Sequence, residues 1–366
     1  MKKHFFLGES AHYTSFERLR HLFSIGTRYD AKALRDFLAQ KYQATKHHVA
    51  LTKNGRSALT IALKFTLPPK SKVVINGFTC YAVYEAIKSA NMIPVFADID
   101  EKTLNFTPST IKKVLTPDTK AIIIQNTLGH PVDIKKIEQL AKQHQLKIIE
   151  DLAHCVNLKY PDGREVGTVG VATMLSFGKD KAIDTISGGA IILRDPSLPA
   201  IKAPKFAPKF SDTFRIRFYP LFSTIYRHLT YFHLEKYWMG CLLKLKWVER
   251  SADNKLDLNR RPPHFVAKLA LLQMKNPHRF KYPLRQFYLV HNRPLVLKKL
   301  QSQGFYFSGL WYETPIAPAR YYKKTHFPEE TCPIATKIAS QIINLPTYYS
   351  SKTLKPALKI IKEFEI

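Results

Sequence analysis

Short apolar runs rich in β-branched residues alternate with amphipathic helical patterns between residues 31 and 194, and this alternation restricts the chain to few folds. Strands are predicted at residues 48–51, 73–75, 93–96, 121–124 and 147–149, with a further pair at 173–177 and 190–193. Helices are predicted at residues 33–43, 57–65, 82–90, 109–114 and 133–144. Such alternation is typical of a mostly parallel sheet covered by helices on both faces. In these sheets, ligands bind where the parallel strands end.

Changes in this pattern divide the chain, which at 366 residues is longer than one compact core usually requires. We expect an N-terminal segment at residues 1–30 and a large α/β domain at 31–195. Residues 196–255 are predicted to be an insertion rich in aromatic and basic residues, and residues 256–366 to end in a small α+β domain. Pro220 is predicted to break the insertion into short helices, because proline lacks the N–H that a helix interior needs.

The balance of charge is strongly basic, since 57 Lys and Arg residues face 28 Asp and Glu residues and give a formal net charge of +29. Such an excess indicates attraction to an anionic partner, whether a phosphorylated ligand, a membrane surface or nucleic acid. The four cysteines are far apart and form no Cys-x-x-Cys pair, so no metal site and no disulfide framework is predicted. No signal segment and no run of about twenty apolar residues is visible, which favours a cytoplasmic location.

A glycine turn at residues 54–57, with the sequence Asn-Gly-Arg-Ser, opens a predicted helix. The N-terminus of a helix presents free N–H groups and a positive dipole end, and both favour a phosphate group. Glycine turns before helices are common, so this motif by itself leaves the ordinary structural interpretation open.

Two carboxylates, Glu150 and Asp151, end a predicted buried strand, and His154 follows closely. Asp151 could pair with a protonated ring nitrogen, which a pyridine cofactor requires. An acidic turn that caps a helix is the alternative interpretation of the same residues.

A loop between two predicted strands carries Lys181, five residues after Ser176 and shortly before Gly188 and Gly189. A lysine in this position could bond covalently to an aldehyde cofactor while the serine hydroxyl holds a phosphate. Lys179 is a rival for this role, and a solvated surface lysine is the alternative for both.

These three motifs, in this order and on this scaffold, resemble the DegT–StrS group of sugar aminotransferases, which have the fold type I architecture of aspartate aminotransferase. The resemblance runs over about residues 31–194 and resumes from about residue 259. It implies a large domain with a mostly parallel mixed sheet flanked by helices, a small C-terminal α+β domain, and pyridoxal 5′-phosphate as the cofactor. The matching segments are residues 55–59, 78–79, 94–100, 116–122, 150–154, 176–177, 181, 188–189 and 345–346.

The resemblance also implies a role for each matching residue. Lys181 would form the Schiff base, because the family's spacing from the serine favours it over Lys179. Asp151 would pair with the pyridinium nitrogen, and His154 would lie near the phenolic oxygen. The remaining implied cofactor-binding residues are Gly55, Arg56, Ser57, Cys80, Tyr81, Ser176 and Asn259.

In the family, the asparagine at the Asn259 position reaches the phosphate of the other subunit, so the resemblance implies a homodimer. Several positions depart from the family's pattern. Cys80 stands where an aromatic residue commonly stacks on the cofactor, and Asn126 replaces a histidine. Ile186 and Ser187 replace a Gly-Glu pair, and Arg56 stands where a threonine is common. These departures concern the substrate more than the attachment of the cofactor.

The implied reaction transfers an amino group from an amino acid, glutamate in much of the family, to a nucleotide-linked keto-sugar for cell-surface polysaccharide. A sugar dehydratase of the same family is one alternative, but that branch typically replaces the lysine by histidine. A non-catalytic protein of this fold, associated with a membrane or nucleic acid, is the other alternative.

The insertion bears on this last alternative. Ten Lys and Arg, three Asp and Glu and twelve aromatic residues lie between residues 202 and 250. Aromatic rings and cations favour the interface of an anionic membrane, so peripheral contact with the inner membrane is one interpretation, and ordinary packing on the enzyme body is the other. No nucleic-acid recognition motif is found, and nucleic acid is therefore not favoured.

Overall fold

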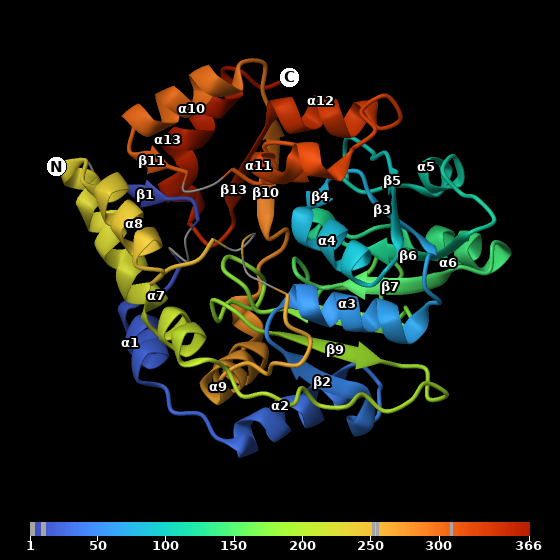
Figure 1. Cartoon of the computed structure of the whole chain (residues 1–366). Coiled ribbons are helices and arrows are strands. Elements are labelled where there is room, and N and C mark those ends of the chain that lie inside the picture. The colour runs from blue at the N-terminus through green and yellow to red at the C-terminus, as the bar shows by residue number, and fades with distance from the viewer. Residues whose placement is uncertain (1–3, 9–11, 251–252, 254–255, 308–309) are drawn as a thin grey trace.

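The computed structural model describes residues 4–8, 12–250, 253, 256–307 and 310–366, and its centre is a seven-stranded sheet of order β2-β9-β8-β7-β6-β3-β5 (Figure 1). Strands β5, β3, β6, β7 and β8 run parallel, whereas β9 is antiparallel to both of its neighbours. The strands are β2 (Val49–Thr52), β3 (Lys72–Asn76), β5 (Ile93–Ala97), β6 (Thr119–Ile124), β7 (Lys147–Asp151), β8 (Ala172–Ser176) and β9 (Gly189–Leu193).

Helices cover both faces of this sheet, because alternate residues of each buried strand point to opposite sides. In β6, Ile122 and Ile124 belong to one core, and Ala121 and Ile123 belong to the other. The first core includes residues of α2 (Arg28–Lys41), α5 (Pro108–Lys112), α6 (Ile134–Gln143) and α9 (His264–Met274). The second includes residues of α3 (Gly55–Thr66), α4 (Tyr81–Ser89) and α12 (Pro333–Gln341).

The C-terminal part forms a small α+β unit with a core of its own. Its strands β10 (Arg285–Leu289) and β13 (Ile342–Pro346) pair antiparallel beside α10 (Arg293–Ser302) and α13 (Ser351–Lys362). The N-terminal strand β1 (Phe5–Phe6) pairs with β11 (Phe305–Tyr306) of this unit. A second short pair of strands, β4 (Thr79–Cys80) and β12 (Ile316–Ala317), connects the C-terminal unit to the large domain. Helix α11 (Ala319–Tyr322) follows β12.

The predicted fold class is confirmed, since the sheet is mostly parallel and mixed, helices flank it, and a small α+β unit ends the chain. The domain boundaries stay predictions, and the one after residue 255 adjoins residues outside the described ranges. Within those ranges, no helix combines the length and the apolar character needed to cross a bilayer.

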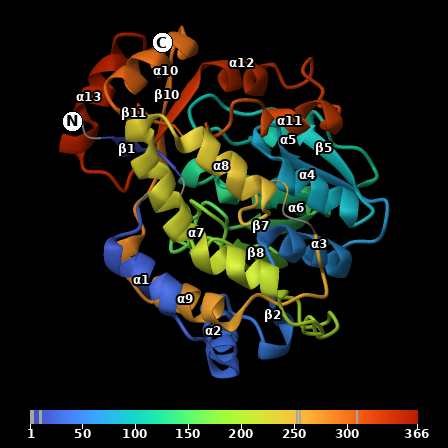
Figure 2. The same ribbon diagram turned by 60° about the vertical axis from the view of Figure 1, so that its left-hand side comes forward.

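The insertion forms two helices, α7 (Phe210–Leu229) and α8 (Glu235–Lys244), which Figure 2 shows side by side above α1 (Ser15–Phe23) and α9. The prediction that Pro220 breaks this segment was wrong, because α7 continues through it. A proline leaves the carbonyl four residues earlier without its helical partner. Here that carbonyl, of Ile216, accepts a hydrogen bond from Nε2 of the buried His21 at 2.8 Å, so a ring on α1 replaces the missing N–H.

Candidate active site

A cavity of about 460 Å³ opens where the parallel strands β7 and β8 end. Its walls come from the turn before α3, the loop after β8, the insertion and the C-terminal unit. Of the predicted site residues, it is lined by Gly55, Arg56, Cys80, Asp151, His154, Ser176 and Lys181.

The two adjacent carboxylates at the end of β7 face opposite ways, as alternation in a strand requires. Glu150 accepts hydrogen bonds from the backbone N–H groups of Gly167, Val169 and Gly170 at 2.7–2.8 Å, so it holds the chain between β7 and β8. Asp151 lines the cavity instead and is only 2% exposed. Burial raises the pKa of Asp151 to about 6, although the N–H of Ala153 and the charge of Lys181 oppose this.

The structure separates the two rival lysines. The Nζ atom of Lys181 lies 3.2 Å from Nε2 of His154 and 4.6 Å from the centre of the Trp311 ring. Lys179 turns toward the insertion, where its Nζ atom contacts the Glu249 carbonyl at 3.4 Å and lies over the Tyr219 ring. Lys181 is therefore the lysine that reaches the inner part of the cavity.

His154 is fully enclosed by groups of the protein. Its Nδ1 accepts a hydrogen bond from the Leu128 N–H at 3.2 Å, and its Nε2 lies 3.3 Å from the Tyr312 hydroxyl oxygen. The Trp311 ring stacks on it at 5.1 Å. Burial, and then the charges of Lys181 and Arg285, lower the pKa of His154 well below its ordinary value, so the ring is neutral.

The turn before α3 meets the end of β8 very closely. A Cβ atom on Gly55 would lie 2.7 Å from Cβ of Ser176, so only glycine fits there. Ser57, in contrast, does not line the cavity. Its N–H donates to Oδ1 of Asn54 at 2.8 Å. The Arg56 guanidinium forms an ion pair with Glu85.

Two further predicted residues lie away from the cavity lining. Tyr81 follows Cys80 but stacks on Tyr321, with ring centres 4.4 Å apart. Asn259 is exposed, and its carbonyl accepts a hydrogen bond from the Phe206 N–H at 2.8 Å. A single chain therefore does not bring Asn259 to its own cavity.

Three site residues escaped the sequence-based prediction: Gln125, Trp311 and Tyr312. The side-chain amide of Gln125 donates to the Tyr312 hydroxyl at 3.3 Å, and Thr79 donates to Gln125 in turn. The adjacent aromatic residues Trp311 and Tyr312 were the only signal, and nothing in their spacing linked them to a strand end more than 150 residues earlier.

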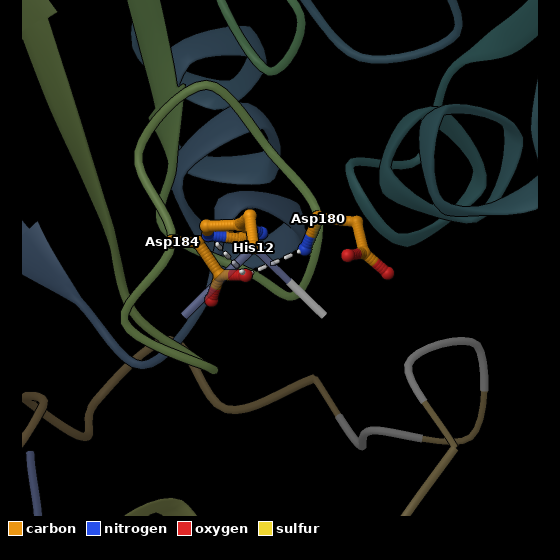
Figure 3. Close-up of side chains that lie close together, drawn as sticks. All are labelled: His12, Asp180 and Asp184. Carbon is orange, nitrogen blue, oxygen red and sulfur yellow. Dashed lines mark hydrogen bonds and ion pairs between the residues drawn. The ribbon is translucent and has the colours of Figure 1, made fainter. Parts of the chain in front are cut away.

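A second cluster of ligand-type side chains lies behind the Lys181 loop and consists of His12, Asp180 and Asp184. Figure 3 shows the Asp184 carboxylate between the His12 ring and the backbone nitrogen of Asp180. Asp184 accepts hydrogen bonds from the N–H groups of Asp180 and Ile186, and Arg279 lies 3.1 Å from the His12 ring. A guanidinium so close disfavours a cation, and these contacts serve to hold the loop that carries Lys181.

Comparison with known proteins gives the family. Residues 30–204 match the sequence profile of the DegT/DnrJ/EryC1/StrS aminotransferase family. The matched residues make up just under half of the chain, and in this part the chain is similar to the members of this family. Its members are pyridoxal-phosphate-dependent aminotransferases, as the motifs of the large domain indicated.

Individual relatives cover different shares of the chain. A pleiotropic regulatory protein of Geobacillus stearothermophilus is 27% identical over 84% of this chain and 81% of its own length. GDP-perosamine synthase of Escherichia coli O157:H7 is 35% identical, over 43% of this chain and 45% of its own length. A putative sugar aminotransferase of Streptococcus pneumoniae, solved in its PLP form, matches with a TM-score of 0.67 at 17% identity over 96% of both chains. The last likeness establishes the fold, which is type I.

The residues of the cavity fit the family's cofactor. Asp151 is a buried carboxylate whose raised pKa shows that the protein alone does not neutralise it, and a protonated pyridine nitrogen would supply the missing cation. Lys181 offers the amine, and Ser176 beside Gly55 offers a hydroxyl at the start of α3, where a phosphate is favoured. Each type of group that the cofactor requires is thus present.

The raised pKa predicts that Asp151 destabilises the cofactor-free protein. The folded protein binds this proton more tightly than the unfolded chain, so stability is lost as the pH rises from the ordinary carboxyl pKa of 3.8 to about 6. Above that range, Asp151→Asn should unfold with a free energy up to about 3 kcal/mol higher than the wild type. Denaturant titrations at several pH values measure the difference.

The higher unfolding free energy of Asp151→Asn should vanish in acid, and it should become smaller when pyridoxal phosphate is bound. Asp118→Asn, at an exposed carboxylate, serves as the control and should change stability little at any pH. Equal stability of Asp151→Asn and wild type at every pH would show that burial does not perturb this group.

Proposed function

We propose that this protein is an aminotransferase that moves an amino group from an amino acid, glutamate in the family's usual case, to a nucleotide-linked keto-sugar. One observation carries this: in a single cavity, the amine of Lys181 lies beside His154, with the buried carboxylate of Asp151 on the same wall. The three groups come from two adjacent strand ends, where ligands of parallel sheets bind.

Each side chain has a defined part in this proposal. Bound pyridoxal phosphate supplies a ring that accepts the electron pair released when a proton leaves the carbon bearing the amino group. Lys181 provides the amine that attaches the cofactor and, once displaced by the amino donor, carries that proton. Asp151 holds the pyridine nitrogen protonated, and His154 donates to the phenolic oxygen. Ser176 and the backbone at Gly55 and Arg56 hold the phosphate.

The substrate class rests on the relatives and on the cavity mouth. GDP-perosamine synthase, a relative, is named for a nucleotide-linked sugar. Arginines from three separate segments, Arg250, Arg261 and Arg320, line the same cavity. Cations at the mouth favour a substrate with a diphosphate, and such sugars serve surface polysaccharide synthesis.

The test of the function is the covalent attachment of the cofactor to Lys181. The purified protein should show a visible absorption band that borohydride removes, with the label on a peptide that contains Lys181. Lys181→Ala should abolish the band and lower turnover by orders of magnitude, because the proton carrier is lost as well.

Lys179→Ala is the matched control and should keep the band, since the Nζ atom of Lys179 lies over the Tyr219 ring at the cavity wall of the insertion and does not contact His154. A label on Lys179 would reverse the assignment. No band after addition of pyridoxal phosphate would favour the non-catalytic alternative, and a band with dehydration but no amino transfer would favour the dehydratase.

A homodimer that shares its active sites is the second part of the proposal. Its support is that Asn259 is exposed and lies outside its own cavity, although Arg260 and Arg261 next to it line that cavity. The segment therefore lies at the cavity's edge, where a second copy of the chain could receive the Asn259 side chain.

Mixed dimers test this arrangement. Lys181→Ala and Asn259→Ala should each be severely impaired alone, and mixing them should restore activity, because one site in each mixed dimer regains both residues. Activity would be read after subunit exchange at equal concentrations. An impaired Asn259→Ala protein that the Lys181→Ala subunit does not rescue would contradict the shared site.

Peripheral contact of the insertion with an anionic membrane is the third part. Between residues 232 and 247, Phe232, Leu234, Tyr237, Leu245 and Trp247 are at least 42% exposed. Lys236, Lys244 and Lys246 are exposed among them. Exposed aromatic rings interleaved with lysines favour the interface of an anionic leaflet over open water.

Vesicle binding measures this contact. The protein should bind anionic but not neutral vesicles, and binding should weaken as salt screens the charges. Replacing the three lysines by glutamine should weaken it at least about tenfold, because each cation contributes on the order of 1 kcal/mol. Phe16→Ser and Tyr29→Ser, at exposed rings outside the insertion, are the controls. Equal binding to both vesicle types, or to neither, would leave the insertion as a packed cover.

A further inference from the structure

The turn after β6 has an unusual backbone. Asn126, Leu128 and Gly129 all have positive φ angles, of 49°, 55° and 88°. Glycine and asparagine adopt this region readily, but leucine does so at a steric cost. A leucine held there by the surrounding structure commonly marks a functional constraint.

Side chains from other segments hold the turn in place. Oδ1 of Asn105 accepts the Thr127 N–H at 2.9 Å, and the amide of Asn76 donates to the Thr127 hydroxyl at 2.8 Å. Within the turn, Oδ1 of Asn126 accepts the Val132 N–H at 3.0 Å. All of these groups are buried, so the conformation of Leu128 is fixed from several directions.

The consequence of this conformation is the direction of one N–H group. The Leu128 N–H points at Nδ1 of His154 and donates to it at 3.2 Å. A neutral imidazole has one N–H and one acceptor nitrogen, so the group that donates to Nδ1 leaves the ring proton on Nε2. Nε2 is the nitrogen that lies 3.2 Å from Nζ of Lys181 and 3.3 Å from the Tyr312 hydroxyl oxygen in the cavity. A charged Lys181 amine is a donor too and competes with a proton on Nε2, so the Leu128 N–H acts against this competition.

We infer that Leu128 is a positioning residue whose backbone N–H fixes the ring proton of His154 on Nε2, so that His154 is a hydrogen-bond donor toward the cavity. Without that N–H, the proton could reside on Nδ1, and Nε2 would present a lone pair to a ligand oxygen. The strained turn therefore determines whether Nε2 of His154 donates or accepts a hydrogen bond in the cavity. This inference rests on the proposed function in one respect only: the oxygen that would accept the hydrogen bond from Nε2 is identified as the phenolic oxygen of the cofactor.

A neighbouring chain of hydrogen bonds is compatible with this position of the proton. Thr79 donates to Gln125, and Gln125 donates to the Tyr312 oxygen, which lies 3.3 Å from Nε2 of His154. The Tyr312 oxygen is thus already an acceptor in this chain and can accept from an Nε2–H as well. This chain leaves room for a donor at Nε2 but does not fix the ring proton, because the Tyr312 hydroxyl can also donate. The Leu128 N–H, a backbone group that can only donate, is the observation that assigns it.

Nitrogen NMR on the full chain labelled with 15N in histidine tests the inference directly. His154→Gln, which removes one pair of resonances, assigns the signals. We expect Nδ1 unprotonated and Nε2 protonated, in spectra recorded both without and with pyridoxal phosphate. The spectrum without cofactor does not require the protein to be active. It therefore tests the position of the His154 proton even if the proposed function is wrong.

Replacing the Leu128 amide by an ester removes the N–H and leaves the side chain in place. The Nδ1–H form should then become about fivefold more populated, the factor that one such hydrogen bond is worth. The matched control is an ester at Gly129, whose N–H donates to Asn126 within the same turn and does not touch His154.

Three results would overturn the inference: a wild-type ring protonated on Nδ1, an unchanged population in the Leu128 ester, or an equal change in both esters. The first of these needs no variant, so the inference can be tested even if the esters do not fold. Asn105→Ala, which removes the acceptor that anchors Thr127, should shift the population in the same direction as the Leu128 ester.

Discussion

The charge of one buried carboxylate organises the active-site region. Asp151 ends a central strand inside the protein. Its raised pKa indicates that the Ala153 N–H and the charge of Lys181 do not fully compensate the burial of its negative charge. Glu150, the preceding residue, is equally buried but has three backbone N–H donors and Arg194 around it. The same strand therefore presents one carboxylate with several donors to the scaffold and one carboxylate with a single backbone donor to the cavity. The second is the one whose charge a cationic cofactor would compensate.

The sequence was informative wherever the determining contacts are local. Apolar runs and helical periodicity located the strands and helices of the large domain, because burial on both faces leaves a continuous signal. Asp151 and Lys181 could be placed at this edge of the sheet because Asp151 ends one recognisable strand and Lys181 lies in the loop after the next. Trp311 and Tyr312 could not, since tertiary packing alone brings them to His154. For Ser57, the N–H that a phosphate would need donates to Oδ1 of Asn54, and its role in binding the cofactor stays a prediction.

The family match and the cavity do not have the same extent. The matched residues, 30–204, supply the turn before α3, the ends of β7 and β8, and the lysine loop. The rest of the wall comes from the insertion and the C-terminal unit, including Tyr219 and Trp311. The predicted cofactor residues Asp151, Ser176 and Lys181 thus lie in the part that matches the family model, whereas the insertion and the C-terminal unit complete the cavity wall outside it.

The bond between His21 and the Ile216 carbonyl has a consequence for how this sequence could change over time. Burial lowers the pKa of His21 to about 4, so the ring stays neutral and the bond does not depend on pH in the neutral range. With the histidine present, a proline at position 220 leaves no carbonyl orphaned; without it, the same proline would interrupt α7. The two distant positions are therefore coupled: while the proline remains, replacing the histidine would leave the Ile216 carbonyl without its partner, whereas the histidine places no such demand on position 220.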